Sequence, residues 1–344
     1  MPRQRRPTRV PTPPWESTFG GREAISGRHL AAIAVLALLA LGAGLAVFAV
    51  ARGIWEKQNR PNSAALQVDE TTYNLRYFAR RLSMYVDEVG GLGSSLARQP
   101  TALQATVQRI VQEELLRRYA SELGLSVEPQ ELEDALRQRV GASAPSEGQE
   151  DTFPTRYQQE LERTGLSDQE YRLMVEGQLL LDKALKHFQD QAPAQAESVR
   201  YRQIVVSSPA QADQIIARIQ GGEDFAAIAR KESLDTLTGP LGGEVGWMPR
   251  GALPSGAESA LFGLAPNQIG KYIDPESGVA YIFQVLEKDP QHPLDAQQKL
   301  VLGRRALDDW LDQKRSQVRI RNYLDVNTGD VRKIEWVLEQ VYEG

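Results

Sequence analysis

The chain has 344 residues, 41% of them hydrophobic, and a formal net charge of −5. This length accommodates about two domains with ordinary hydrophobic cores. The negative charge argues against a nucleic-acid-binding protein, because affinity for polyanions comes mainly from clustered Lys and Arg. There is no cysteine, and the three histidines, His29, His187 and His292, are scattered along the chain. Disulfides and cysteine-based zinc sites are therefore excluded, and we expect neither a metal nor a cofactor.

Residues 1–28 are rich in Pro, Arg, Ser and Gly and show no hydrophobic period, which predicts a disordered tail. The segment from Leu30 to Val50 contains no charged residue. As a helix it would rise about 31 Å, close to the bilayer core of about 30 Å. A buried helix of a soluble protein is the alternative, but such helices seldom lack a polar face over this length. We therefore predict a transmembrane helix at residues 29–51.

Ala49-Val-Ala51 resembles the cleavage site of a secretory signal, but cleaved signals usually have apolar regions of only about 7–15 residues. A retained single-pass anchor in the cell membrane is therefore the prediction. Six arginines precede the span against two acidic residues. The positive-inside rule then places the N-terminal tail in the cytoplasm and everything from Trp55 onward on the extracytoplasmic side.

Residues 62–192 are expected to form a helical region. A short strand over Leu66–Tyr73 precedes a helix from Arg76 to Val86. Further apolar residues recur at helical spacing, namely Leu103, Val107, Ile110, Val111, Leu115 and Tyr119. Gly124 is placed to end this helix, Pro129 to open the next, and Ser167 to begin another through a capping box with Glu170. The polar run at residues 142–151 predicts a surface loop.

The next stretch has a different pattern. A strand-like opening, Val199–Val206, is followed by two short helical patterns, a glycine-rich strand around Leu241–Met248, another helix and a closing apolar strand, Tyr281–Val285. This order predicts a compact α+β unit.

Six segments of this unit resemble, in the same order, the parvulin family of peptidyl-prolyl isomerases. They are Arg202–Val206, Gly222–Ala229, Ser233–Asp235, Gly242–Trp247, Glu258–Phe262 and Tyr281–Val285. The resemblance implies a small antiparallel sheet with flanking helices at residues 197–290 and cis–trans isomerisation of X–Pro bonds.

Residues 293–344 return to helical spacing, with a last short helix around Val331–Val341. Helices, parvulin-like unit and more helices together resemble the SurA, PrsA and PpiD type of extracytoplasmic foldase. The resemblance implies that the terminal helices pack on the region at 62–192 as one chaperone module with the parvulin domain inserted. It also implies unfolded or newly translocated polypeptides as partners, and it leaves open a homodimer through the helical arms.

The resemblance also assigns candidate site residues. The two histidines of the family fall on Gln203 and Tyr281, whereas its Cys or Asp position is kept as Asp235. These three are the catalytic candidates. The substrate-binding candidates are the aliphatic, Met and Phe positions of the proline pocket, which fall on Val245, Leu253 and Ala257, together with Phe262.

Each catalytic candidate also has a structural interpretation. Gln203, Tyr281 and Asp235 can form a hydrogen-bond network across adjacent strands, but the first two can equally satisfy each other within a sheet. Asp235 can instead cap the turn before Gly239-Pro240.

Two functions therefore remain open. One is a membrane-anchored prolyl isomerase that acts on secreted chains. The other is a non-catalytic holdase chaperone with a degenerate parvulin domain that only binds peptide. A pure scaffold for an envelope complex has no positive signal in the sequence.

Overall fold

The structure is a computed structural model, and it describes residues 41–42, 44–45, 47–55, 58–97, 100–142 and 151–343. The predicted tail, most of the predicted transmembrane helix and most of the predicted loop at 142–151 lie outside these ranges. Residues 41–55 are helical wherever they are described. No helix within the described ranges is both long enough and apolar enough to cross a membrane. The chain divides into two compact units, residues 1–61 and 62–344.

The second unit begins with a small sheet that joins its two ends. β1 (Ala64–Val68) and β2 (Thr71–Asn74) form an antiparallel hairpin where the sequence predicted one strand. β7 (Ile320–Asn322) pairs with the other side of β1, which places Leu66 opposite Asn322. The order β2-β1-β7 therefore ties the last part of the chain to the first.

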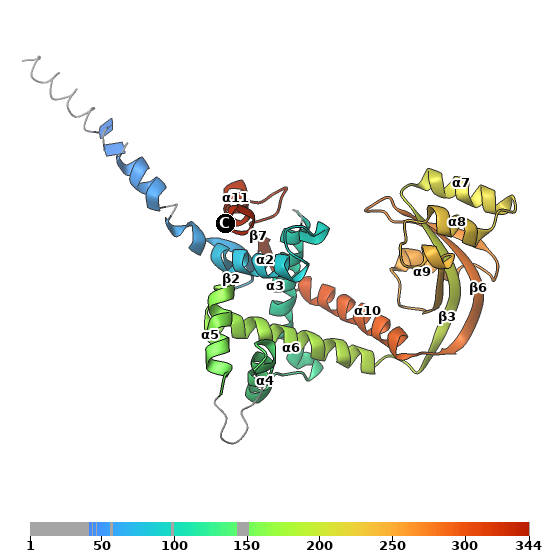
Figure 1. The fold of residues 1–344 in the computed structure, drawn as a ribbon, viewed down its shortest axis with the longest axis horizontal. Coiled ribbons are helices and arrows are strands. Elements are labelled where there is room, and N and C mark those ends of the chain that lie inside the picture. The colour runs from blue at the N-terminus through green and yellow to red at the C-terminus, as the bar shows by residue number, and fades with distance from the viewer. Residues whose placement is uncertain are drawn as a thin grey trace, which may run out of the picture. The chain divides into compact units, whose positions relative to one another are not determined.

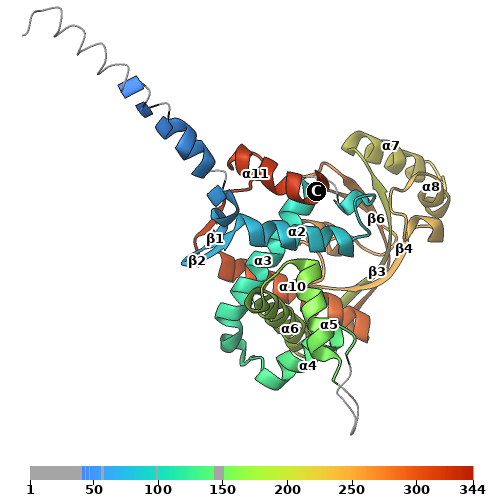
Figure 2. The same ribbon diagram turned by 60° about the vertical axis from the view of Figure 1, so that its left-hand side comes forward.

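Helices from both ends of the unit make one module (Figures 1 and 2). They are α2 (Leu75–Glu88), α3 (Thr101–Tyr119), α4 (Pro129–Arg139), α5 (Phe153–Thr164), α6 (Asp168–Asp190), α10 (Ala296–Arg315) and α11 (Val331–Leu338). Shorter turns are η2 (Arg60–Asn62), η3 (Ser95–Ala97), η4 (Ala120–Leu123) and η6 (Glu339–Glu343). Leu307 and Leu311 of α10 and Val337 of α11 share one hydrophobic core with Phe78 and Tyr171. The C-terminal helices thus complete the core of the module.

Two predicted helix ends are confirmed by their geometry. The hydroxyl of Ser167 accepts from the backbone N–H of Glu170, and the Glu170 carboxylate accepts from the backbone N–H of Ser167 at 2.8 Å. This reciprocal capping satisfies two N–H groups that the first turn of α6 leaves unpaired. Gly124 follows η4 with φ 69°, a left-handed conformation that favours glycine.

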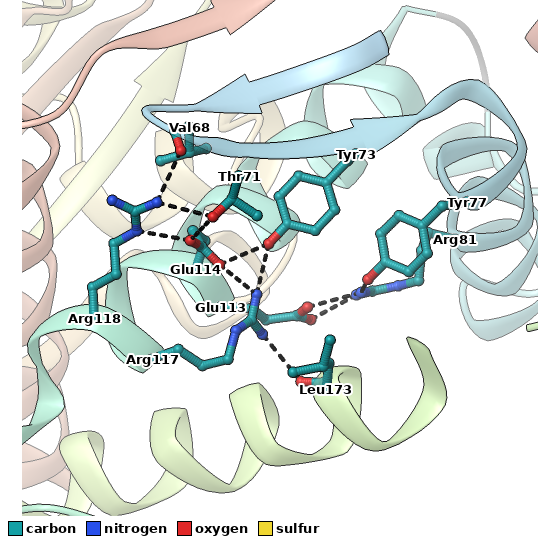
Figure 3. A network of polar contacts seen from close by, with 10 residues as sticks. All are labelled: Val68, Thr71, Tyr73, Tyr77, Arg81, Glu113, Glu114, Arg117, Arg118 and Leu173. Atoms are coloured by element: carbon teal, nitrogen blue, oxygen red, sulfur yellow. Dashed lines mark hydrogen bonds and ion pairs between the residues drawn. The ribbon is translucent and has the colours of Figure 1, made fainter. Parts of the chain in front are cut away.

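A buried ion pair lies inside the module (Figure 3). The Arg81 guanidinium donates to both oxygens of the Glu113 carboxylate, at 2.6 and 2.8 Å, and also to the Tyr77 hydroxyl at 2.6 Å. The neighbouring Glu114 carboxylate accepts from Thr71, Tyr73, Arg117 and Arg118. These contacts join the β1–β2 hairpin and α2 to α3, and they satisfy charges that would be costly to bury alone.

The inserted domain is built on a second sheet, in the order β4-β3-β6-β5, in which every neighbouring pair is antiparallel. Its elements are β3 (Gln195–Val206), α7 (Pro209–Gln220), α8 (Phe225–Glu232), η5 (Gly239–Leu241), β4 (Glu244–Pro249), α9 (Ser255–Phe262), β5 (Ile269–Ile273) and β6 (Ala280–Pro293). Figure 1 shows α7, α8 and α9 gathered around β3 and β6, and Figure 2 shows β4 beside β3. The predicted α+β class and the small antiparallel sheet are confirmed.

The two faces of this sheet have separate cores. Ile204, Val206 and Ile282 pack with residues of α7 and α8 on one face. Val199, Tyr201, Phe283 and Val285 pack with α9 on the other, which we call the α9 face. Because successive side chains in a strand point to opposite faces, this division also fixes where Gln203 and Tyr281 lie.

Paired strands connect the inserted domain to the helical module. Gln195, at the start of β3, lies opposite Pro293, at the end of β6, so the domain is slightly longer than the predicted 197–290. α6 runs into β3 and β6 runs into α10, and these two helices cross closely. A Cβ atom on Gly303 would lie 2.7 Å from the backbone nitrogen of Gln189, so this crossing requires glycine.

Candidate functional site

The α9 face brings Gln203 and Tyr281 onto adjacent strands. In the pairing of β3 with β6, Gln203 lies opposite Phe283 and Val205 lies opposite Tyr281. Gln203 shares its strand face with Val199 and Tyr201, and Tyr281 shares its face with Phe283 and Val285. The two candidates are thus diagonal neighbours on one surface.

Asp235 is held against Gln203 by the loop between α8 and β4. The side-chain amide of Gln203 donates to Asp235 Oδ2 at 2.8 Å, and the Thr238 hydroxyl donates to the same oxygen. Asp235 Oδ1 accepts from the backbone N–H groups of Leu237, at 3.0 Å, and Thr238, at 3.2 Å. Asp235 therefore caps the turn, which is its structural role. It also contacts Gln203, another catalytic candidate.

These contacts determine the ionisation of Asp235. Its partial burial by itself raises the pKa, but hydrogen bonds from the Thr238 hydroxyl, the Gln203 amide and two backbone N–H groups outweigh it and hold the pKa of Asp235 below its usual value. Asp235 is consequently a carboxylate at neutral pH.

Gly243 allows the loop to lie directly on β3. Its carbonyl accepts from the backbone N–H of Gln203 at 2.7 Å, and its own N–H donates to the carbonyl of Thr238 at 2.8 Å. Its φ is 82°, and a Cβ atom would lie 2.2 Å from the carbonyl oxygen of Gln203. Only glycine fits between the two, so the short distance between Gln203 and Asp235 depends on this residue.

Tyr281 belongs to the surface but not to this hydrogen-bonded pair. Its ring lies 6.1 Å from the Tyr272 ring and 6.3 Å from the Phe283 ring, centroid to centroid. Within the described residues, no hydrogen bond joins Tyr281 to Gln203 or Asp235. The predicted three-residue network is therefore present as the Gln203–Asp235 pair, with Tyr281 placed beside it among aromatic rings.

All four substrate-binding candidates lie in the hydrophobic cluster of the α9 face. Val245 and Leu253 are half-buried and offer apolar surface. Ala257 and Phe262 are only 7% and 6% exposed. The Phe262 ring is also covered by the guanidinium of Arg250, 4.3 Å from its centroid. Val245 and Leu253 can therefore touch a ligand, whereas Ala257 and Phe262 support the surface from below.

Two tyrosines of this surface, Tyr201 and Tyr272, were not predicted as site residues from the sequence. Tyr201 packs edge-on against Phe283 with centroids 5.7 Å apart, and both burial and the charge of Asp235 raise the pKa of its hydroxyl. Tyr272 comes from β5 and packs on the start of α9, where a Cβ on Gly256 would lie 2.8 Å from its ring. The alternation of β3 could have revealed Tyr201, two residues before Gln203, but no local signal pairs β5 with α9.

The arrangement has three chemical features in one place. Four rings, those of Tyr272, Tyr281, Phe283 and Tyr201, follow one another across the sheet. An ionised carboxylate, Asp235, lies at their edge, and phenol groups supply hydrogen-bond donors. Phe283 and Tyr201 are buried, so the exposed parts of Tyr272 and Tyr281 form the surface that suits an apolar ring attached to a polar amide.

Comparisons with known proteins identify two domains in this chain. Residues 28–185 match the SurA-like N-terminal domain, and residues 194–289 match the PPIC-type PPIASE domain. The foldase protein PrsA of Caldanaerobacter subterraneus subsp. tengcongensis is 36% identical over 97 residues, which are 28% of this chain and 32% of that protein. The chaperone SurA of Bordetella parapertussis is 37% identical over 122 residues, 33% of this chain and 23% of that protein.

The chain thus spans a third or less of the length of these two curated relatives. Among solved structures, PrsA of Bacillus anthracis is similar at 21% identity and a TM-score of 0.43, covering 61% of this chain and 95% of that chain. The two domain matches follow one another along the sequence; the first includes α2 to α5 and most of α6 of the helical module, and the second covers most of the inserted domain. The chain therefore contains a SurA-like N-terminal domain followed by a domain of the PPIC-type peptidyl-prolyl isomerase family.

Proposed function

We propose that this protein is a membrane-anchored foldase that isomerises X–Pro bonds in secreted polypeptides and chaperones them through its helical module. The observation that carries the isomerase part is the contact between Gln203 and ionised Asp235 at the edge of the aromatic α9 face. The match to the PPIC-type domain supports the same reaction.

The chemistry requires only rotation about an amide bond, with a barrier of about 18–20 kcal/mol. Resonance in the planar amide places partial negative charge on the carbonyl oxygen. A carboxylate near that oxygen, here Asp235, disfavours the planar amide relative to the twisted one, in which resonance is lost. The hydroxyl of the half-buried Tyr281 can donate to the amide nitrogen, whose lone pair becomes available in the twisted state. Val245 and Leu253 provide apolar contact for the proline ring.

A protease-coupled isomerisation assay on the full chain tests this reaction. Wild type should accelerate cis–trans exchange of an X–Pro peptide above the uncatalysed rate, and Asp235→Asn should remove most of the acceleration. Asparagine keeps an oxygen that can accept the turn hydrogen bonds of Asp235 but removes the charge, so the melting temperature should change little. A wild-type rate equal to the uncatalysed rate for several X–Pro peptides would overturn the isomerase proposal.

A non-catalytic holdase is the second candidate. It is favoured by the replacement of both family histidines and by Tyr281, which packs among rings and is not bonded to Gln203. In that case the full chain should delay aggregation of an unfolded client, without nucleotide, while X–Pro exchange stays at the uncatalysed rate. Light scattering of the client and the isomerisation assay, run on the same preparation, separate the two functions.

The proposed anchor is the uncharged segment Leu30–Val50, supported by the arginines that precede it and the helical conformation described within 41–55. Protease added to spheroplasts should degrade the chain beyond Trp55 and leave a tag at Met1 protected. Protection of the large unit, or a mature N-terminus near Arg52, contradicts the anchor. A homodimer through the helical arms also belongs to the proposal, and sedimentation velocity of the detergent-solubilised full chain tests it.

A further inference from the structure

An open groove lies beside the last strand of the helical module. It has a volume of about 430 Å³ and is lined by α3, by the end of α10, by β7 and by the loop that follows β7. Its apolar lining side chains are Leu103, Val107 and Val111 of α3 together with Ile320, Leu324 and Val326. We call it the β7 groove. Every lining residue belongs to the helical module, so the groove is separate from the Gln203–Asp235 site of the inserted domain.

The strand that lines this groove has a free edge. In the order β2-β1-β7, β7 is an edge strand and pairs with β1 alone. The carbonyl of Arg319 accepts from the N–H of Asp69 at 2.9 Å, and the N–H of Tyr323 donates to β1 at 3.0 Å. Backbone groups of an antiparallel strand face alternate sides, so those of Ile320 and Asn322 face away from β1. Within the described residues no strand pairs with them, and they can pair with an added strand.

Three arginines lie along this edge. Arg315 lines the groove, whereas Arg321 and Arg319 alternate with the groove-lining residues of β7, so their side chains lie on its other face. All three are exposed, and none of their guanidinium groups forms an ion pair with another described residue. Asp69, whose carboxylate accepts from the Arg319 N–H, already pairs with Arg118 at 3.0 Å. The edge therefore offers positive charge to a partner that carries carboxylates.

One carboxylate, that of Asp325, also lines the groove. Its Oδ1 accepts from the backbone N–H groups of Asn327 and Thr328, both at 2.9 Å, and from the Thr328 hydroxyl at 3.0 Å. These bonds hold the pKa of Asp325 below its usual value, so it is charged at neutral pH. Asp325 follows the end of β7, whereas Arg315 and Arg319 precede its start. The groove is therefore positive at one end and negative at the other.

A second copy of this chain fits the edge poorly. If β7 paired with the β7 of another copy about a two-fold axis at Arg321, its middle residue, the two Arg321 side chains would lie directly opposite each other. If the axis passed through Ile320, Arg321 would face Arg319. Like charges in such positions destabilise a sheet. The same charges favour a partner segment that is acidic.

We propose that the β7 groove docks an extended segment of a partner protein, which adds to the three-stranded sheet as a fourth strand beside β7. In this segment apolar residues, which face α3, alternate with acidic residues, which lie beside Arg319 and Arg321. The main-chain hydrogen bonds provide affinity and the alternate side chains provide specificity. The partner class is a protein with an acidic, amphipathic, extended tail or linker, and no proline is required in it.

The first test measures which peptides bind. It uses the full chain in lipid nanodiscs and short labelled peptides without proline, in which Val alternates with Glu, Gln or Lys. By fluorescence anisotropy, wild type should bind the Val-Glu peptide at least about tenfold more tightly than the Val-Lys peptide, with the Val-Gln peptide between them. The preference should shrink when salt is raised from about 0.05 M to about 0.5 M, because salt screens exposed charges.

The second test asks whether the peptide adds as a strand. Ile320→Pro removes the N–H that faces the groove but no backbone bond to β1, and proline is tolerated at a sheet edge in that orientation. Ile320→Ala is the matched control, since it keeps the N–H and also loses the packing of the half-buried isoleucine. Ile320→Pro should bind the Val-Glu peptide at least about tenfold more weakly than Ile320→Ala, at similar melting temperatures.

The third test reverses the charge. The double variant Arg319→Glu, Arg321→Glu should prefer the Val-Lys peptide, and its melting temperature should stay close to wild type because both side chains are exposed. Arg230→Glu, which changes an exposed arginine of α8, should leave the preference for the Val-Glu peptide intact. X–Pro isomerisation by the double variant should equal that of wild type, because the groove is separate from the candidate active site.

Each outcome decides one part of the proposal. Equal affinity for the Val-Glu and Val-Lys peptides, or an unchanged preference in the double variant, overturns the acidic partner. Equal affinity for the Val-Glu and Val-Gln peptides would make the groove a general site for unfolded clients and overturns it too. Equal binding by Ile320→Pro and Ile320→Ala overturns the added strand. Absence of binding to every peptide overturns the docking site, whatever the isomerase assay shows.

Discussion

Alanine at position 243 should detach the Asp235 loop from β3. A Cβ atom there would lie 2.2 Å from the carbonyl oxygen of Gln203, a backbone atom that cannot swing away as a side chain can. Gly246 offers a matched control in β4. It has a similar φ, 92° against 82°, but a Cβ on it meets no atom within 4 Å. Comparing Gly243→Ala with Gly246→Ala separates the free-energy cost of a left-handed backbone conformation from the cost of the close contact with the Gln203 carbonyl.

The magnitudes follow from these two differences. A non-glycine residue in the left-handed region costs about 1–2 kcal/mol, and this applies to both variants. Only Gly243→Ala also breaks the hydrogen bonds from Gln203 N–H to its carbonyl and from its N–H to Thr238, worth about 1 kcal/mol each. We expect a loss of local stability of about 3–4 kcal/mol for Gly243→Ala and about 1–2 kcal/mol for Gly246→Ala.

Amide hydrogen exchange of the full chain, read by mass spectrometry over Val199–Val206, measures this local stability. The opening free energy of the Gln203 amide should fall further in Gly243→Ala than in Gly246→Ala. Isomerisation should be lost in the first variant and retained in the second, because only the first moves Asp235. Equal losses of protection in the two variants would refute the structural role assigned to the close approach.

Three further predictions concern charge and packing. Glu113→Gln should destabilise the module by about 3–5 kcal/mol in urea unfolding, because it leaves Arg81 charged and buried. As a control, Glu88→Gln, in the exposed ion pair with Arg109, should lower the free energy of unfolding by under about 1 kcal/mol. The lowered pKa of Asp235 keeps its carboxylate charged above about pH 5, so kcat/KM for isomerisation should be constant from there to pH 8 and fall only in acid. A rise of kcat/KM toward acid would show that protonated Asp235 is the catalytic form. Ala257→Phe should lower stability by about 1–3 kcal/mol through overpacking, and a gain in peptide affinity at unchanged stability would contradict the burial of Ala257.

Local patterns predicted most of the secondary structure. The capping box at Ser167, the glycine stop at Gly124 and the apolar periods of α3 and α10 all depend on residues within a few positions of one another. The pairing of β1 with β7 joins residues about 250 positions apart, as in the bond from Arg319 N–H to Asp69. No short-range period encodes that contact, so the region predicted as helices with one short strand contains a three-stranded sheet.

The candidate site was predictable in its residue types and less so in its contacts. Gln203 and Asp235 follow from the resemblance to parvulins, and the structure brings them within hydrogen-bond distance. The separation of Tyr281 from that pair and the contribution of Tyr272 depend on how β5, β6 and α9 pack together. Side-chain packing between elements distant in sequence is set by shape complementarity, which a single sequence does not display.

Exchange spectroscopy by NMR on a Leu-Pro peptide, with substoichiometric full chain in nanodiscs, tests the central claim most directly. It observes interconversion of the cis and trans forms at equilibrium without a coupling protease. Wild type should produce exchange cross-peaks between the two forms, and Asp235→Asn, at the same peptide occupancy, should reduce the exchange rate by about a hundredfold. Cross-peaks absent in wild type despite peptide binding, or equally strong in Asp235→Asn, would contradict catalysis by the Gln203–Asp235 site.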